Sequence, residues 1–231
     1  MTGYTLGPGG EVNLSSDNFV DFNFRRAPGF FDVVAYTGTG SARTVSHNLG
    51  VVPEFCIVKR RDATAFWPTW SSAFTSFQYV ALNETSSKYD DGSSNQTFSF
   101  TSTGWSIGTT YSSVNASGAT YIAYLFASCP GVSKVGSYTG TGTTLNIDCG
   151  FTAGARFVLI KRTDSTGDWY VWDTARGIVS GNDPYLLLNS TAAEVTSTDY
   201  IDPLSSGFQI SSTAPAAINA NGGSFIYLAV A

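Results

Sequence analysis

The chain is built from short apolar runs, and none of them carries a convincing helical period. The segments "TYIAYLFA" (residues 120–127) and "FIYLAV" (residues 225–230) are continuous runs of aromatic and aliphatic residues. A continuous run of this length predicts a strand that is buried on both faces. Near the N-terminus, Val20, Phe22 and Phe24 instead alternate with polar residues. A period of two predicts a strand with one face in water.

Turn residues separate these runs at regular intervals. The segment "RFVLIKR" (residues 156–162) is typical of a central strand, "DSTGDW" (residues 164–169) of a turn, and "WYVWD" (residues 169–173) of the next strand. Short strands at a spacing of about 10–15 residues are typical of a β-sandwich. The sequence therefore predicts an all-β fold of jelly-roll or lectin-like β-sandwich type.

Several stretches of the sequence occur twice. The pentapeptide "YTGTG" stands at residues 36–40 and again at residues 138–142, which is 102 residues later. At the same offset, "FCIVKRRDATAFW" (residues 55–67) lies over "FVLIKRTDSTGDW" (residues 157–169). Later matches drift to offsets of 103 to 106, as loop insertions would produce. We interpret the chain as two tandem copies of one unit of about 100 residues.

The segment that closes each unit occurs three times, whereas the body of the unit occurs twice. Residues 19–36 align with residues 121–138, again at an offset of 102. One closing strand is therefore surplus, and it lies at the N-terminus. The predicted organisation is an N-terminal arm with the surplus strand (residues 1–31), a first β-sandwich unit (residues 32–131) and a second unit (residues 132–231).

Composition and charge narrow the classes of function. Charged residues make up 13% of the chain, against about 25% in an average soluble domain, and the net charge is −5. Nothing forces a basic face, so we expect no nucleic-acid binding. No apolar run approaches 18 residues, and the first 16 residues lack the pattern of a signal peptide, so neither membrane insertion nor export is expected. The three cysteines do not have the spacing of a disulfide framework or a zinc site.

Candidate catalytic residues are few. His47 is the single histidine, and its neighbours "SHNLG" predict an exposed turn. The sets "KRRD" (residues 59–62) and "KRTD" (residues 161–164) recur in both units and are interpreted as charged ends of core strands, with phosphate or sialic-acid binding as the alternative. The second unit is richer in acids, which are interpreted as solvated loop residues: Asp164, Asp168, Asp173, Asp183, Glu194, Asp199 and Asp202. The prediction is a protein that is not an enzyme and has no catalytic residue, cofactor or metal site.

The tryptophans and one long loop are the remaining candidates for binding. Trp67 and Trp70 recur as Trp169 and Trp172, which favours packing over sugar stacking. The polar segment "ETSSKYDDGSSNQ" (residues 84–96) is longer than its counterpart in the second unit, so we expect an exposed loop there. This loop supplies the residues predicted for surface recognition: Lys88, Tyr89, Asp90 and Asp91.

The same residues carry a resemblance to a known family. Stretches such as "NASGATYIAYLFA" (residues 115–127), "VSKVGSYTGTGTT" (residues 132–144) and "ARFVLIKRTDSTGDWYVWDTARG" (residues 155–177) resemble an uncharacterised repeat domain of tailed-phage virion proteins. That domain is common in marine and environmental phages and often forms the C-terminal part of fibre-like or lectin-like proteins. The resemblance covers residues 19–231 and implies a structural or surface protein of the virion. It implies no catalytic residues.

We therefore expect a non-enzymatic bacteriophage virion protein of head-decoration or fibre type. It would be assembled in the cytoplasm of the bacterial host, form a homo-oligomer and bind other virion proteins such as capsid, tail or fibre subunits. The residues expected to carry assembly are those of the surplus strand: Phe19, Val20, Phe22 and Phe24. One alternative is a receptor- or carbohydrate-binding module of a tail fibre or adhesin that binds a host surface glycan. Another is a glycan-degrading enzyme that uses acids of the second unit, namely Asp183, Asp199 and Asp202.

Overall fold

The computed structural model describes residues 4–90, 92, 98–108 and 111–231. The chain is nearly all β, as the sequence predicts, and all its strand pairs are antiparallel. Strands of the first half are β1 (Phe31–Thr37), β2 (Arg43–Ser46), β3 (Phe55–Arg60), β4 (Pro68–Ser71), β5 (Gln78–Ala81), β6 (Tyr89–Asp90), β7 (Ser99–Phe100), β8 (Gly104–Ile107) and β9 (Thr120–Phe126). Those of the second half are β10 (Ser133–Thr139), β11 (Leu145–Asp148), β12 (Phe157–Arg162), β13 (Trp169–Asp173), β14 (Leu186–Leu187), β15 (Ile201–Leu204), β16 (Gly207–Ile210) and β17 (Ser224–Val230).

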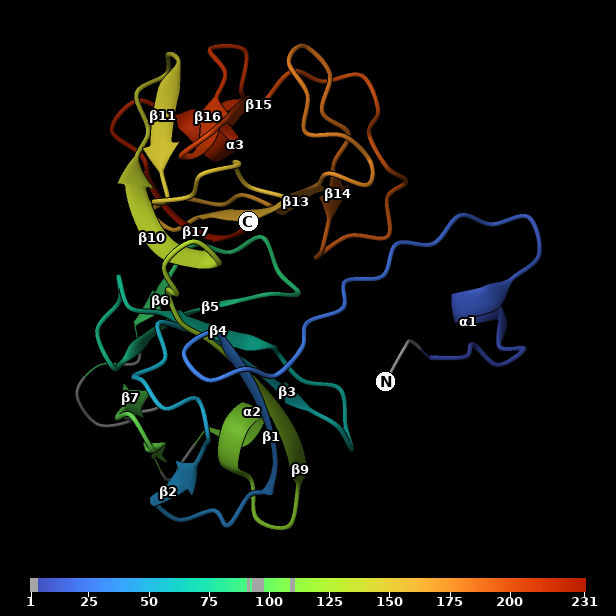
Figure 1. Ribbon diagram of the computed structural model, residues 1–231. Helices are drawn as coiled ribbons and strands as arrows, with labels where there is room; N and C mark the ends of the chain where they lie inside the picture. The colour runs from blue at the N-terminus through green and yellow to red at the C-terminus, as the bar shows by residue number, and fades with distance from the viewer. Residues whose placement is uncertain (1–3, 91, 93–97, 109–110) are drawn as a thin grey trace.

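Three short helices complete the secondary structure of the described residues: α1 (Gly10–Asn13), α2 (Ser112–Asn115) and α3 (Ala216–Asn219). Each has four residues, so none is stable without tertiary contacts. Helices α2 and α3 precede the closing strands β9 and β17, and each delivers an asparagine to a turn, whereas α1 lies apart in the N-terminal arm (Figure 1).

The two halves have the same strand order, apart from the additional edge strand β6 in the first. In the first, a large sheet runs β1-β9-β3-β4-β5-β6 and a small one β2-β8-β7. In the second, the large sheet runs β10-β17-β12-β13-β14 and the small one β11-β16-β15. No strand pair joins the halves among the described residues, so the sheets divide where the sequence places the boundary between residues 131 and 132. This is the arrangement that a duplication would give, although the duplication itself stays a prediction from sequence.

Within each half, the small sheet packs on the large one through aromatic side chains. Trp105 of β8 meets Tyr36 of β1 edge to face, with ring centroids 5.8 Å apart. In the second half, Phe208 of β16 meets Tyr227 of β17 in the same way at 5.5 Å. Each half is therefore a small β-sandwich with its own aromatic interior.

A further core lies between the two halves, which are stacked in Figure 1. Alternate residues of β17 face different cores: Ile226 and Leu228 pack with residues of the first half, whereas Phe225 and Tyr227 pack inside the second. The large sheet of the second half is thus buried on both faces, as its continuous apolar run predicts. The two halves share one core and are not independently packed domains.

The repeated "YTGTG" segment is a turn that is held in the same way in both halves. Asn219 Oδ1 accepts the Thr141 backbone N–H at 2.9 Å, and its Nδ2 donates to the Thr143 carbonyl at 2.8 Å. Asn115 holds the backbone N–H of Thr39 at 3.0 Å in the first half. The chain approaches closely here, because a Cβ at Gly140 would lie 2.3 Å from the Ala220 carbonyl oxygen. The glycines of this segment therefore serve backbone packing, and the turn is not a ligand loop.

Candidate functional site

The N-terminal arm is anchored where the two halves meet. The ring of Phe24 packs edge-on against Phe126 of the first half and Phe157 of the second, with centroids 5.3 and 5.6 Å apart. Phe22 adds a second edge-on contact to Phe157 at 5.2 Å. Each such aromatic pair contributes about 0.5–1.5 kcal/mol beyond the area that it buries. These two residues of the predicted assembly set therefore fasten the arm to both halves at once.

An ion pair secures the end of the arm. The Arg26 guanidinium donates to the carboxylate of Asp32 at 2.6 Å, and the other carboxylate oxygen accepts the Asn48 backbone N–H at 2.7 Å. Asp32 is a charged residue of strand β1 and its side chain is buried, so its carboxylate needs these partners. Arg26 fixes the point at which the arm leaves the body.

The predicted surplus strand at Phe19–Phe24 does not exist in the structure. The segment has no strand assignment, and no backbone hydrogen bond joins residues 4–26 to the remainder of the described chain. In each half, the closing strand lies between the first and third strands, and in the first half β9 already occupies that place. The place of a closing strand is therefore filled, and the N-terminal copy is held by side chains alone.

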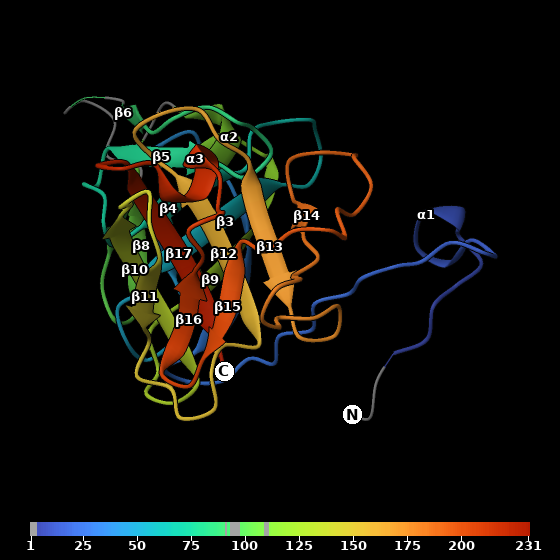
Figure 2. The same cartoon turned by 90° about the horizontal axis from the view of Figure 1, so that it is seen from above.

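Beyond Phe22 the arm leaves the body, and both views show α1 standing apart from it (Figures 1 and 2). Large apolar side chains are exposed along it: Tyr4 (59%), Leu6, Val12, Leu14 (52%), Phe19 and Val20. Phe19 and Val20, the other two residues of the predicted assembly set, are therefore accessible. Contiguous exposed apolar residues on a soluble protein mark an interaction surface.

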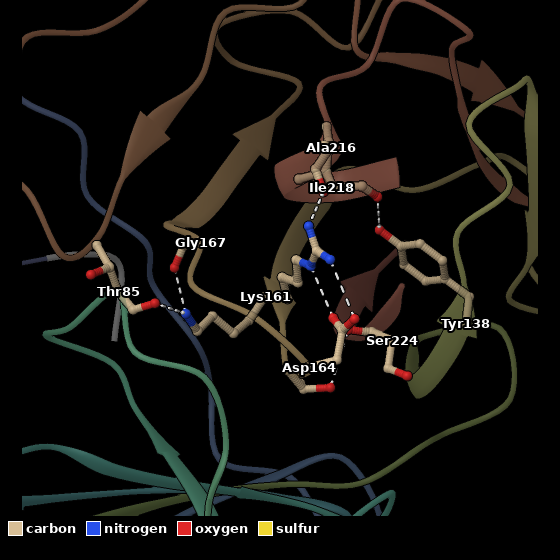
Figure 3. A network of polar contacts seen from close by, with 10 residues as sticks. Thr85, Tyr138, Lys161, Asp164, Gly167, Ala216, Ile218 and Ser224 are labelled. Carbon is tan, nitrogen blue, oxygen red and sulfur yellow. Dashed lines mark hydrogen bonds and ion pairs between the residues drawn. The ribbon is translucent and has the colours of Figure 1, made fainter. Parts of the chain in front are cut away.

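A buried lysine connects the halves on another side of the shared core (Figure 3). Lys161 is 0% exposed, and its ammonium donates to the carbonyls of Thr85, in the first half, and Gly167, in the second. The Gly167 N–H also bonds the Thr85 carbonyl at 2.9 Å. The sequence places Lys161 at a charged strand end but does not predict its burial. Its counterpart Lys59 is less buried and lies 4.9 Å above the Trp67 ring.

Burial lowers the pKa of Lys161 from 10.5 to about 8. Between these values the unfolded chain holds more protons than the folded one, so the free energy of unfolding rises with pH in this window. We expect wild-type protein to gain up to about 3 kcal/mol between pH 8 and pH 10.5 relative to the Lys161→Met variant. Urea denaturation of both proteins across this range measures the difference. The titrations of tyrosines and cysteines affect both proteins equally and therefore do not contribute to this difference. If the free energies of unfolding of the two proteins change with pH in the same way, the expectation is wrong.

The residues predicted for surface recognition lie on the loop that contacts the second half. Lys88 and Asp90 are exposed, Tyr89 stacks on Tyr79 with centroids 5.1 Å apart, and Asp91 lies outside the described residues. The Lys88 backbone N–H bonds the Thr163 carbonyl, so the start of this loop is docked on the second half and does not project freely. A cleft of about 390 Å³ opens beside Lys88. Hydroxyl side chains of Ser137, Thr139, Thr163 and Ser224 take part in its lining. Recognition by this loop stays a prediction.

Two other sequence interpretations are wrong. His47 is buried and does not lie on an exposed turn, because its ring stacks near Trp105 and its Nδ1 accepts the Leu49 N–H. Asp173 and Asp183 are also buried and are not solvated loop acids. Asp173 ends strand β13 and pairs with Arg176 at 2.8 Å. Burial raises the pKa of Asp183 to about 6, and its two oxygens accept the backbone N–H groups of Tyr200 and Ile201 at 2.8 and 3.1 Å. These buried residues therefore hold local structure.

The tryptophans pack, as predicted, because Trp70, Trp105, Trp169 and Trp172 are all buried. Cys56 also packs as a small buried hydrophobic residue of strand β3. The described residues contain no group of three or more His, Cys, Asp or Glu side chains placed to hold a metal ion. The same residues include no helix that is both long and apolar enough to cross a membrane.

With this geometry in hand, the chain can be compared with known proteins. A family model described as "Domain of unknown function (DUF7483)" matches residues 1–231. The chain belongs to this family. The DUF7483 match includes the arm as well as both halves. Neither the curated proteins nor the solved structures contain a match to this DUF7483 chain.

Proposed function

We propose that this protein is a non-enzymatic bacteriophage virion protein, exposed on the particle as a head-decoration or fibre-type component and attached through its N-terminal arm. The observation that carries the proposal is the arm itself. It is anchored by Phe22 and Phe24 across both halves, and it presents apolar side chains to solvent from Tyr4 to Val20. The resemblance of residues 19–231 to tailed-phage virion domains supports the same assignment.

The division of the molecule supports an attachment role. Buried polar side chains of the body make structural hydrogen bonds, as at Asn219 and Asp183. The arm, in contrast, has apolar surface that its own body does not cover. Covering six large apolar side chains would favour association, at roughly 25 cal/mol per Å² of apolar area before the cost of ordering the arm. A virion subunit needs such a segment to join a particle.

A truncation that keeps the anchor tests this proposal. We expect a variant lacking residues 1–20 to fold with an unchanged unfolding midpoint, because Phe22, Phe24 and Arg26 are retained. We also expect it to be lost from virions when it is supplied during infection in place of the full chain. Mass spectrometry of purified particles, with immunogold labelling of the full-length protein as the control, measures incorporation.

Two results would count against the proposal. Absence of the full-length protein from purified particles would reject the virion assignment. Normal incorporation of the truncated variant would reject attachment through the arm. If purified protein instead blocks adsorption of the phage to its host, the receptor- or glycan-binding alternative is supported, and the cleft beside Lys88 is then the surface to mutate.

A further inference from the structure

A groove runs along the root of the arm. It has a volume of about 570 Å³ and lies between residues 19–25 of the arm and the open end of the second half. Its lining combines the apolar residues Phe157 and Val230 with charged residues of both signs. These are Arg25, Arg156 and Arg176 against Asp21 and Asp173, an excess of one positive charge. The volume is within the range of about 300–1,000 Å³ that bound ligands occupy. The groove is therefore large enough to receive several side chains of a docked segment.

Two cations of this groove lack an acidic partner. Among the described residues, Arg176 pairs with Asp173 and Glu194, whereas Arg25 and Arg156 make no ion pair. Both are exposed. The groove therefore offers apolar surface flanked by two guanidinium groups, and the segment that fits it is apolar and acidic.

The outer part of the arm has this chemistry. Residues 4–18, which we call the hook, contain two acids, Glu11 and Asp17, and no base, which gives a formal charge of −2. Apolar residues of the hook (Tyr4, Leu6 and Val12) and of the arm root (Phe19 and Val20) together line a hollow of about 430 Å³. The hook thus resembles half of a small core, and both views show it away from its own body (Figures 1 and 2).

We propose that the hook of one copy binds in the arm-root groove of a second copy, so that the chains assemble by exchanging their arms. Asp17 of the hook faces the guanidinium groups of the groove, and the apolar hook residues cover Phe157 and Val230. Exchange of an identical segment between copies is a low-cost route to an oligomer, because it needs no new partner surface. This inference concerns purified protein and does not depend on where the protein sits on a particle.

The absence of backbone hydrogen bonds from residues 4–26 to the body favours exchange. A segment that is held by side chains alone can leave one position and enter another without breaking a sheet. The aromatic anchor at Phe22 and Phe24 stays in place, so each copy keeps its own arm root while the hook reaches outward. The exchanged part is the hook.

A mixed cross-linking experiment separates exchange between copies from docking within one chain. The Asp17→Cys variant is mixed with the Arg156→Cys variant, both as full chains, and the mixture is oxidised. We expect a covalent heterodimer in the mixture and much less dimer in either variant alone. Arg156→Cys is replaced by Arg61→Cys in the control, because Arg61 is also an exposed arginine but lies outside the groove. Wild-type protein controls for the native cysteines.

Charge reversal provides the second test. By sedimentation equilibrium at low salt, we expect Asp17→Lys and Arg156→Glu each to raise the dissociation constant at least about tenfold, and the double variant to recover much of the loss. Arg61→Glu should leave it unchanged. A chain that stays monomeric, or an oligomer that is indifferent to these reversals, overturns the proposal. So does a monomeric chain whose hook cross-links to a different virion protein, and that result would leave the virion assignment intact.

Discussion

Replacing Trp169 by alanine is expected to lower the free energy of unfolding by about 3–5 kcal/mol, the largest effect of any substitution considered. The side chain is 1% exposed and lies in the core that the two halves share. Its Nε1 donates to the Ala81 carbonyl across the boundary at 2.8 Å, and its ring meets Phe55 edge to face at 6.3 Å. The substitution removes a buried aromatic side chain and leaves a buried carbonyl without this donor.

The shape of the unfolding curve is expected to change as well. Because the shared core couples the halves, wild-type protein should unfold in one transition, and Trp169→Ala should separate it into two. Trp67→Ala is the matched control, since Trp67 occupies the same position in the first half but is only partly buried there. Differential scanning calorimetry follows both variants. Equal losses of stability would show that the shared core contributes little.

The second large effect is expected at the asparagines that hold the "YTGTG" turns. Asn219 is 2% exposed, and its amide satisfies Thr141 N–H and Thr143 carbonyl at once. Alanine would remove the buried amide that pairs with both backbone groups of this exposed turn, so we expect a loss of about 1–3 kcal/mol in the free energy of unfolding. Asn115→Ala should produce a similar loss, because Asn115 bonds Thr39 and Ser41 in the same way.

Chemical denaturation of these variants measures the effect. Asn221→Ala is the control, because Asn221 is exposed two residues after Asn219, and it should change stability by less than about 0.5 kcal/mol. If Asn219→Ala behaves like this control, the turn is not under the constraint that the hydrogen bonds indicate. If Asn219→Ala is costly and Asn115→Ala is not, the two turns are not equivalent in energy.

Local pattern predicted the strands well. The continuous apolar run at residues 225–230 gave a strand that is buried on both faces, and the repeat gave two halves with one strand order. The turn at "YTGTG" followed from its glycines. These features depend on residues close together in sequence, or on a period that the sequence displays.

Features that depend on contacts between distant segments were missed. The alternation at Phe19–Phe24 matches a strand, but β9 already occupies the closing position between β1 and β3, which the local pattern does not indicate. His47 is predicted to lie on an exposed turn because its neighbours are polar, and Lys161 is predicted only as the charged end of a core strand, yet other segments cover both. Lys59 and Lys161 hold equivalent positions in the two repeated segments, so the sequence does not distinguish them. They differ in the side chains and backbone that pack on them.

The place where the arm is fastened has a mechanical consequence. A pull on the arm would reach the Phe22 and Phe24 rings and the Arg26 ion pair before any strand, and these contacts involve both halves. The force would therefore reach the boundary between the two halves and be shared by the large sheet of each half. A subunit tethered at this point can swing on its arm under shear while its body keeps its shape.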